Sequence, residues 1–473
     1  MVTPTSGEGE SSGTTGPGGE GTSSEGTSSE SSSSEGTSGG GPVVEGWLRS
    51  FGAPDVQRAG GLGFAMSGEL WVAGDVIGGL DLGTGVLAGE GSGIYLARYG
   101  HAGATLHAQA LFPADGEPTL TSVTGLAVDG TGAVIVTGWL EGSYTIGGAD
   151  LVADEIDVFV GKWDADGAPV WGQKFGEVDW QVGYGVAVGP DDSLWVAGAA
   201  LAPFMAGDIA LSGAASTGMF LLHLDPDGTP VYGRWWGEMG DQEARGVAVC
   251  ADGSIALAGF ITAPLMFGAD QVEAVGDKDM FVAHLDDAGE PLWIRGLGGA
   301  STDYASHVQC RDDLLFAGAA TGPATIGALE LGAGGGADVV LGRFALDGAL
   351  GWATGVTGPE DQSPGGIGLG MNGESFVLVT TTGTTTLGDV AVDGAGDRDV
   401  VLARYAADAS SPAEAVMLGD AARETAGALV VHPSGTAALA ISHAGEMTFE
   451  GLAPVAAAGP EDLGLLQWLP GAL

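Results

Sequence analysis

Apolar residues alternate with small or polar residues in short segments along most of the chain, and turn-forming residues separate these segments. The stretch DVFVGKWDADGAPVWGQKFG (157–176) is typical, because two segments rich in β-branched and aromatic residues flank the turn signal DADG. Nearly the same stretch returns as MFLLHLDPDGTPVYGRWWG from Met219 and as DMFVAHLDDAGEPLWIRGLG from Asp279. Each copy predicts a β-hairpin.

These hairpins belong to a larger unit with a period of about 60 residues, the size of a supersecondary unit that cannot bury its apolar face alone. The first strand of the unit occurs seven times, as GLGFAM from Gly61, GLAVDG from Gly125, GVAVGP from Gly185, GVAVCA from Gly246, SHVQCR from Ser306, GIGLGM from Gly366 and GALVVH from Gly427. A second strand such as LWVAG from Leu70 follows closely. We therefore predict seven copies of a four-stranded unit, whose third and fourth strands are the hairpin.

The fourth strand of the unit places one large residue four positions before another. The pairs are His107/Leu111, Trp171/Phe175, Tyr232/Trp236, Trp293/Leu297 and Trp352/Val356, while Glu414/Leu418 departs from the pattern. The chain ends in LGLLQWLPGAL, a third strand that lacks a fourth, and the segment VVEGWLRSFGAPD near the start supplies Trp47 and Phe51 in the fourth-strand slots. Pairing Val44–Phe51 with Leu463–Leu469 would close a ring and remove an exposed sheet edge.

We therefore predict an all-β fold, a seven-bladed β-propeller of four-stranded blades over residues 43–473, with the N-terminal strand completing the last blade. Residues 1–42 are rich in Ser, Gly, Glu and Thr and have no aromatic residue, Lys or Arg. Such a segment cannot bury enough apolar surface to offset its ordering entropy, so it is predicted to be a disordered linker.

Charge narrows the range of partners. The chain has 14 Lys and Arg against 61 Asp and Glu, a net charge of -47. Nucleic acids and anionic membranes are disfavoured as partners because phosphate binding needs the opposite field. No apolar run approaches the roughly 18 residues of a transmembrane helix. Cations, basic proteins or a saline environment fit better, and so does high solubility without any partner.

The glycine-rich first strand, the LWVAG-like second strand, the [DG]-x-F-V-A-[KR]-[YW]-D third strand and the [LV]-W-x-x-x-F-G fourth strand together resemble the seven-bladed β-propeller repeat (SBBP) of bacterial surface proteins and lipoproteins. The resemblance covers Val43 to Leu473. It implies an extracellular or outer-surface interaction scaffold, tethered through the N-terminal linker and binding a protein or carbohydrate. The chain is expected to be monomeric. Its first residue is expected to be a mature or truncated start, because no charged-then-apolar signal segment precedes the linker.

One aspartate per blade lies between the fourth strand and the next first strand: Asp55, Asp115, Asp179, Asp241, Asp303, Asp361 and Asp420. All seven should emerge on one face of the ring. They could hold cations, with Ca²⁺ the best match for oxygen ligands, or contact a basic partner. Alternatively, each accepts backbone N–H bonds in its own turn, which we favour because one carboxylate per blade makes a wide ring. The turns DADG, DPDG and DDAG lack the other ligands of a calcium loop and are read as turns with a left-handed Gly.

Two histidines are candidate metal ligands, and two cysteines are candidates for free thiols or a disulfide. His223 and His284 occupy a third-strand slot that elsewhere holds Arg98, Lys162, Arg343, Arg404 and Gln467, so they are expected to replace long polar side chains rather than to bind metal. The cations of this slot are expected to pair with carboxylates. Cys250 and Cys310 end the first strands of adjacent blades at equivalent positions, where the Cα distance usually exceeds about 7 Å. We therefore expect two free, buried thiols, although a disulfide between blades stays open.

The sequence favours a non-enzymatic interaction scaffold without a resident cofactor. One alternative is a metal-dependent hydrolase or lyase centred on the channel, which would need several inward carboxylates or histidines. Another is a quinoprotein-like propeller, whose tryptophan-docked blades share the outline strand, D-x-x-G, Trp; the chain lacks the vicinal Cys pair of the dehydrogenases. In the scaffold version of that repeat, Trp serves only packing between blades.

Overall fold

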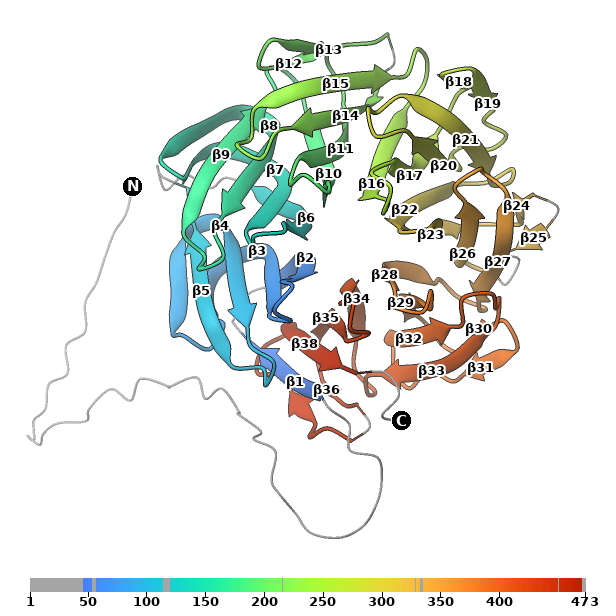
Figure 1. The fold of residues 1–473 in the computed structure, drawn as a ribbon. Helices are drawn as coiled ribbons and strands as arrows, with labels where there is room; N and C mark the ends of the chain where they lie inside the picture. Colours follow the sequence, from blue (N-terminus) through green and yellow to red (C-terminus); the bar gives the residue numbers. More distant parts are fainter. Residues whose placement is uncertain are drawn as a thin grey trace, which may run out of the picture.

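The structure is a computed structural model that describes residues 46–52, 57–113, 120–214, 216–327, 329–331, 335–449 and 451–469. In these residues it consists of seven four-stranded antiparallel blades around a central channel, with no helix (Figure 1). The predicted seven-bladed β-propeller is confirmed. The linker predicted over residues 1–42 lies outside the described residues.

Each blade runs from an inner strand at the channel to an outer strand at the rim. Blade 1 contains β2 (Gln57–Phe64), β3 (Leu70–Asp81), β4 (Val86–Tyr99) and β5 (Thr105–Leu111). Blade 2 contains β6 (Thr121–Val128), β7 (Val134–Ile146), β8 (Ala149–Trp163) and β9 (Pro169–Phe175). Blade 3 contains β10 (Gln181–Val188), β11 (Leu194–Ala200), β14 (Gly218–Leu224) and β15 (Pro230–Trp236). Blade 4 contains β16 (Gln242–Val249), β17 (Ile255–Ile261), β20 (Asp279–Leu285) and β21 (Pro291–Leu297).

The remaining blades follow the same order. Blade 5 contains β22 (Asp303–Cys310), β23 (Asp313–Ala320), β26 (Asp338–Ala345) and β27 (Leu350–Thr357). Blade 6 contains β28 (Ser363–Leu369), β29 (Ser375–Thr381), β32 (Asp399–Tyr405) and β33 (Pro412–Leu418). Blade 7 contains β34 (Glu424–Val431), β35 (Ala437–His443), β38 (Asp462–Trp468) and, from the other end of the chain, β1 (Gly46–Phe51).

A small hairpin extends the connection between the second and third strands. In blades 1 and 2 it continues the long strands β3–β4 and β7–β8. In the other blades it is a separate pair: β12 (Phe204–Ala206) with β13 (Ile209–Leu211), β18 (Leu265–Phe267) with β19 (Asp270–Val272), β24 (Ala324–Ile326) with β25 (Leu329–Leu331), β30 (Thr385–Leu387) with β31 (Val390–Val392), and β36 (Glu446–Met447) with β37 (Val455–Ala456). These hairpins lie at the rim (Figure 1).

The ring closes through β1, as predicted. β1 pairs antiparallel with β38, Trp47 opposite Gln467 and Phe51 opposite Leu463. Trp47, Leu48 and Phe51 are all at least 95% buried. The N-terminal strand therefore supplies both the hydrogen-bonded edge and the apolar surface that blade 7 lacks.

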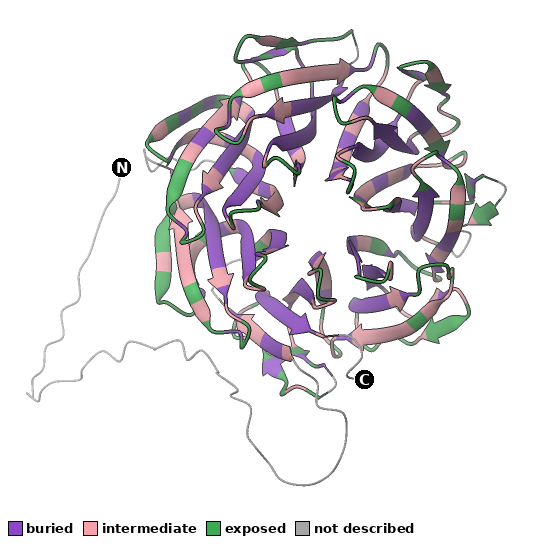
Figure 2. Ribbon diagram, in the orientation of Figure 1, coloured by how far each residue is buried: buried purple, intermediate pink, exposed green. Residues whose placement is uncertain are grey.

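The core lies between blades. Leu465 and Ala440 of blade 7, for example, share an apolar cluster with Leu70 and Tyr95 of blade 1, and comparable clusters fill the other junctions. Figure 2 shows the result: the second and third strands are largely buried, while the innermost strands mix buried and intermediate residues and the outer strands alternate between intermediate and exposed residues. Each blade thus buries its two faces only against its neighbours, which explains why the repeat needs a closed ring.

Tryptophans of the fourth strands connect neighbouring blades by hydrogen bonds as well as packing. The indole N–H of Trp293 donates to the Leu346 carbonyl of the next blade at 2.8 Å, and that of Trp352 donates to the Ala407 carbonyl at 3.2 Å. Trp171 makes the equivalent bond to Pro226 at 3.3 Å. These contacts agree with the expectation that Trp serves packing between blades.

Equivalent residues of neighbouring inner strands meet, as at Gly125 beside Gly185 and Gly366 beside Leu429, so the seven strands run in the same direction along the channel. All links between consecutive blades, together with the links between second and third strands, therefore lie at one end of the channel. We name this end the connection face. The tight turns between first and second strands and between third and fourth strands form the opposite end, the turn face.

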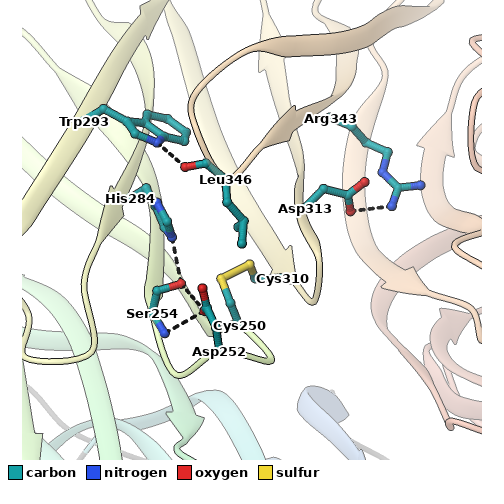
Figure 3. The surroundings of a disulfide bond; sticks show 9 residues. All are labelled: Cys250, Asp252, Ser254, His284, Trp293, Cys310, Asp313, Arg343 and Leu346. Atoms are coloured by element: carbon teal, nitrogen blue, oxygen red, sulfur yellow. Dashed lines mark hydrogen bonds and ion pairs between the residues drawn. A yellow bond between two sulfur atoms is a disulfide. The ribbon is translucent and has the colours of Figure 1, made fainter.

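The expectation of two free thiols is wrong: Cys250 and Cys310 form a disulfide, with Cα atoms 4.6 Å apart (Figure 3). The two positions are not equivalent. β16 ends at Val249, so Cys250 follows its strand, whereas Cys310 is the last residue of β22. This one-residue offset directs the side chains toward each other, and the N–H of Ala251 also donates to the Arg311 carbonyl at 3.0 Å.

Candidate functional site

The predicted ring of aspartates is irregular in the structure. Asp55 and Asp115 lie outside the described residues. Relative to the start of the inner strand, the other five occupy four different offsets: Asp303 begins β22, Asp241 and Asp361 precede a buried Gln by one residue, and Asp179 and Asp420 lie two and four residues ahead of Gln181 and Glu424. The five carboxylates therefore do not repeat one geometry.

Three of these aspartates accept backbone hydrogen bonds. Asp303 is fully buried and accepts the N–H of Gly299 at 2.7 Å. Asp361 accepts the N–H of Ala337 at 2.9 Å. Asp420 accepts those of Ala422 and Glu446 at 2.6 and 2.8 Å. Their carboxylates organise the local loops, which is the role favoured from the sequence, while cation or partner binding at the ring stays a prediction.

On the turn face, the recurring cation of the third strand pairs with an acid of the first turn in its own blade, as expected. The Lys162 ammonium lies 2.9 Å from the Asp129 carboxylate, and Arg343 pairs with Asp313. Arg98 approaches Glu69 at 3.6 Å and Arg404 approaches Glu374 at 3.9 Å. These ion pairs join neighbouring strands of one blade.

The two histidines of this slot take the same place with neutral contacts. The His284 Nε2 lies 2.8 Å from the Ser254 hydroxyl, which in turn donates to Asp252 at 2.5 Å (Figure 3). His223 stacks on Trp195, with ring centroids 4.1 Å apart. Burial lowers the pKa of both imidazoles, so both are neutral at pH 7.

The acidic turns DADG, DPDG and DDAG are each held by hydrogen bonds within the turn. The first aspartate of each turn accepts two backbone N–H groups, as Asp164 does from Asp166 and Ala168 at 2.9 and 2.8 Å. The glycines Gly167, Gly228 and Gly289 have φ of +90°, +83° and +79°. Left-handed glycine therefore explains these turns, because a Cβ is strained at such φ values.

Sequence reasoning missed a buried polar position at the start of each inner strand. The residues there are Gln57, Thr121, Gln181, Gln242, Asp303, Gln362 and Glu424. The Nε2 groups of Gln181 and Gln242 donate to the carbonyls of Val178 and Met239 at 2.6 Å, which fixes the link from the preceding blade. The signal was visible as a glutamine that recurs one or two residues after the aspartate of that link.

At several junctions this position lies close to a buried aspartate in the third strand of the preceding blade, as with Gln181 and Asp157. A side chain added at Gly176 would place its Cβ 1.8 Å from the Asp157 carboxylate and 2.3 Å from the Gln181 amide, so both groups crowd this glycine. Lys174 also pairs with Asp157, at 2.5 Å. A carboxylate and an amide can coexist there, because the amide is neutral and has N–H donors.

Two junctions put a second carboxyl group in place of the amide. Asp303 lies with Asp279 around Gly298, and Glu424 lies near Asp399 and Asp420. Burial, and then the neighbouring carboxylates, raise the pKa of Glu424 to about 7. Burial likewise raises the pKa of Asp303. The described residues contain no group of three or more His, Cys, Asp or Glu side chains arranged to hold a metal ion.

The central channel narrows to a hollow of about 230 Å³ that is lined by all seven inner strands. Arg245, Tyr184, Ser306 and His307 contribute polar side chains to it. Among the described lining residues, His307 is the one carboxylate or imidazole group, whereas a channel-centred metal hydrolase would need several.

Exposed apolar side chains occur in several links of blades 2 to 4 on the connection face. Val178, Met239 and Val275 are 59%, 62% and 75% exposed, and Leu120 and Leu201 lie in neighbouring links with 54% and 38% exposure. Acidic residues flank them: Glu177 and Asp179 surround Val178, and Glu238 precedes Met239. We name Leu120, Val178, Leu201, Met239 and Val275 the apolar tips.

No protein-family model matches the chain, so membership of the SBBP family is unconfirmed. No curated protein matches it either. Among solved structures, the chain is similar to the Pan2 WD40 domain of Neurospora crassa, at 10% identity over 88% of this chain and 90% of that one, with a TM-score of 0.44.

Similar structures also include the quinohemoprotein alcohol dehydrogenase of Comamonas testosteroni, at 11% identity over 82% of this chain and 65% of that one (TM-score 0.37). A europium-containing methanol dehydrogenase matches at 10% identity over 84% of each chain (TM-score 0.36). At these identities and scores the similarities carry no information about function. No helix in the described residues is long and apolar enough to cross a membrane.

Proposed function

We propose that the protein is a non-enzymatic interaction scaffold of the extracellular space or outer cell surface. The observation that carries the proposal is the set of apolar tips on the connection face, set among carboxylates. Exposed apolar groups with a polar surround are typical of protein contact sites. The net charge of -47 selects a partner that presents Lys or Arg around an apolar patch.

The disulfide supports the proposed location. Structural disulfides persist in oxidising compartments and are rare in reducing ones. The bond between Cys250 and Cys310 joins two blades and thus belongs to the folded domain. If the protein lies on the cell surface, a protease added to intact producing cells removes it from them, while a cytoplasmic marker stays intact. Survival of the protein under that treatment contradicts the location.

Site-specific photocrosslinking in the producing cells tests the contact surface. We expect a crosslinking residue at Val178 or Met239 to yield a discrete adduct with a second protein. Val231 and Leu292 serve as matched controls, since they are 58% and 53% exposed but lie on the outer strands β15 and β21. Absence of an adduct at both tip positions, or equal adducts at tips and controls, would refute the proposed surface.

A further inference from the structure

Every inner strand of the ring contains a β-bulge at the same level. The register shifts by one residue between Ala59 and Gly61 in β2, between Ala244 and Gly246 in β16, and at the corresponding place in each of the other five inner strands. A bulge leaves one residue without a partner in the ladder and redirects its side chain. The seven bulge residues are thus the ones that line the hollow at this level.

The wall of the hollow is asymmetric. Blades 2 to 5 place side chains at the bulge: Thr124, Tyr184, Arg245 and Ser306. Blades 6, 7 and 1 place Gly365, Gly427 and Gly60 there. Blade 5 also carries His307 at the next position, where five of the other six blades have glycine. A polar arc therefore faces a glycine arc, where glycines and the aliphatic side chains Leu62, Ile367 and Leu429 line the hollow.

Arg245 is the organising residue of the polar arc. Its guanidinium lies 5.5 Å from the ring centre of Tyr184, 5.2 Å from that of Phe260 and 5.3 Å from that of Tyr304. Its Nε donates to Glu243 at 2.9 Å, and the side chain keeps 31% of its surface exposed. Three rings and a carboxylate fix the guanidinium in one orientation, and the ion pair leaves this part of the channel without a net positive charge.

His307 adds a neutral imidazole. The Ser306 hydroxyl lies 2.7 Å from its Nδ1, which leaves Nε2 for another hydrogen bond. Enclosure in the channel wall lowers the pKa of the imidazole to about 4, so the ring is uncharged at neutral pH. The polar arc thus presents fixed donors and acceptors without net charge.

We propose that the channel hollow binds a neutral polyhydroxylated ring, a single sugar unit or the terminal unit of a glycan. Arg245 would donate to adjacent hydroxyl oxygens, His307 would exchange a hydrogen bond with a further hydroxyl, and the ring would rest against the glycine arc. The volume of about 230 Å³ lies below the roughly 300 Å³ of typical sites for drug-sized ligands, so a single ring matches it better. An anionic ligand would be repelled both by Glu243 and by the field of a protein with a net charge of -47.

Saturation-transfer NMR on the full chain tests the site, with methyl glycosides of neutral hexoses, pentoses and 6-deoxyhexoses and with the matching uronic acids. We expect transfer to at least one neutral glycoside and none to its uronic acid. Arg245→Ala should weaken that binding at least about tenfold, the loss expected for a charge-assisted hydrogen bond. Arg234→Ala is the matched control. Arg234 lies on the outer strand β15 and pairs with Glu290, so this variant should leave binding unchanged.

His307→Gly keeps the test decisive if Arg245→Ala does not fold, because it installs the residue that blades 1 to 4 carry at this position. It should abolish or strongly reduce transfer. The proposal is overturned by absence of transfer to every neutral glycoside, by stronger binding of the uronic acids, or by unchanged binding in the folded Arg245→Ala or His307→Gly protein. The crosslinking result at the apolar tips is independent of these outcomes, because neither variant touches those loops.

Discussion

The buried residue at the start of each inner strand determines whether the junction with the preceding blade holds a neutral side chain or a carboxyl group. The Nε2 groups of Gln181, Gln242 and Gln362 donate to carbonyls of the preceding link. Glu424 occupies the same place in blade 7 and is fully buried, with the carboxylates of Asp420 and Asp399 nearby. An ionised carboxylate cannot donate to a carbonyl, whereas a protonated carboxyl group can. Protonation of Glu424 therefore restores the donor that glutamine provides elsewhere.

Glu424→Gln should stabilise the protein at alkaline pH. The pKa of Glu424 is raised from 4.5 to about 7 in the folded state. The folded chain therefore holds this proton more tightly than the unfolded chain, and the free energy of unfolding falls as pH rises from 4.5 through about 7. The variant should lose this contribution to the pH dependence, and its free energy of unfolding should exceed that of the wild type by about 3 kcal/mol at pH 8. Urea denaturation from pH 5 to pH 8 measures it.

The reciprocal variant Gln362→Glu provides the control. It creates the same acid pair at the junction where Asp338 begins the third strand, since Gly358 donates to Asp338 at 3.2 Å and lies beside Gln362. This variant should acquire a loss of stability with rising pH. If Glu424→Gln keeps the wild-type slope and Gln362→Glu gains none, the junction does not titrate as the contacts require.

The aspartate ring can be tested with calcium. Because Asp303, Asp361 and Asp420 accept backbone N–H groups, calcium and sodium chloride at matched ionic strength should stabilise the protein equally. A bound ion would add RT ln(1 + [L]/Kd), about 2.7 kcal/mol at a concentration 100 times Kd. Thermal melts of the wild type and of a variant with Asn at all seven positions check this. A saturable calcium effect that the Asn variant loses would instead identify a cation site.

At the scale of elements, the sequence reveals strands more easily than their register. The recurring hairpins and the Trp47 and Phe51 slots predict all seven blades and the closing strand. The sequence motifs align Gly246 with Ser306, whereas the ladders align Gly246 with His307. The offset between Cys250 and Cys310 therefore stays hidden, and the sequence favours free thiols over the disulfide. The facing of Asp157 and Gln181 is equally hidden, because it joins residues of different blades. The polar arc of the channel is hidden for the same reason, because its residues come from different blades.

Loss of the disulfide should loosen the junction of blades 4 and 5. The bond closes a loop between residues 60 positions apart, which corresponds to about 4 kcal/mol in the chain-entropy estimate and typically 2–4 kcal/mol in practice. The double variant Cys250→Ser with Cys310→Ser should therefore unfold at lower urea concentration. Reduced wild-type protein should behave like the double variant, and a reductant should not change the variant further. Equal stability of oxidised and reduced wild type would contradict this.

For the whole molecule, stability depends on closing the ring, since no blade has a core of its own. β1 lies at the junction where the two ends of the chain meet, and its partner strand β38 has no other neighbour on that side. The Ser50 hydroxyl is also 2.9 Å from the His443 imidazole, so the closing strand contributes polar as well as apolar contacts to blade 7. An open ring would expose the edge of β38 and the apolar faces of blades 7 and 1.

Deletion of residues 1–52 should therefore abolish cooperative unfolding or cause aggregation. It removes all six residues of β1, including the buried Trp47, Leu48 and Phe51. A chain that lacks only residues 1–40 retains β1 and should melt as the full chain does. Calorimetry and light scattering compare the three proteins, and a peptide of residues 43–52 added to the shorter chain should restore part of the lost stability by refilling the strand position. A 1–52 deletion that melts like the full chain would mean that the other six blades hold blade 7 without its closing strand.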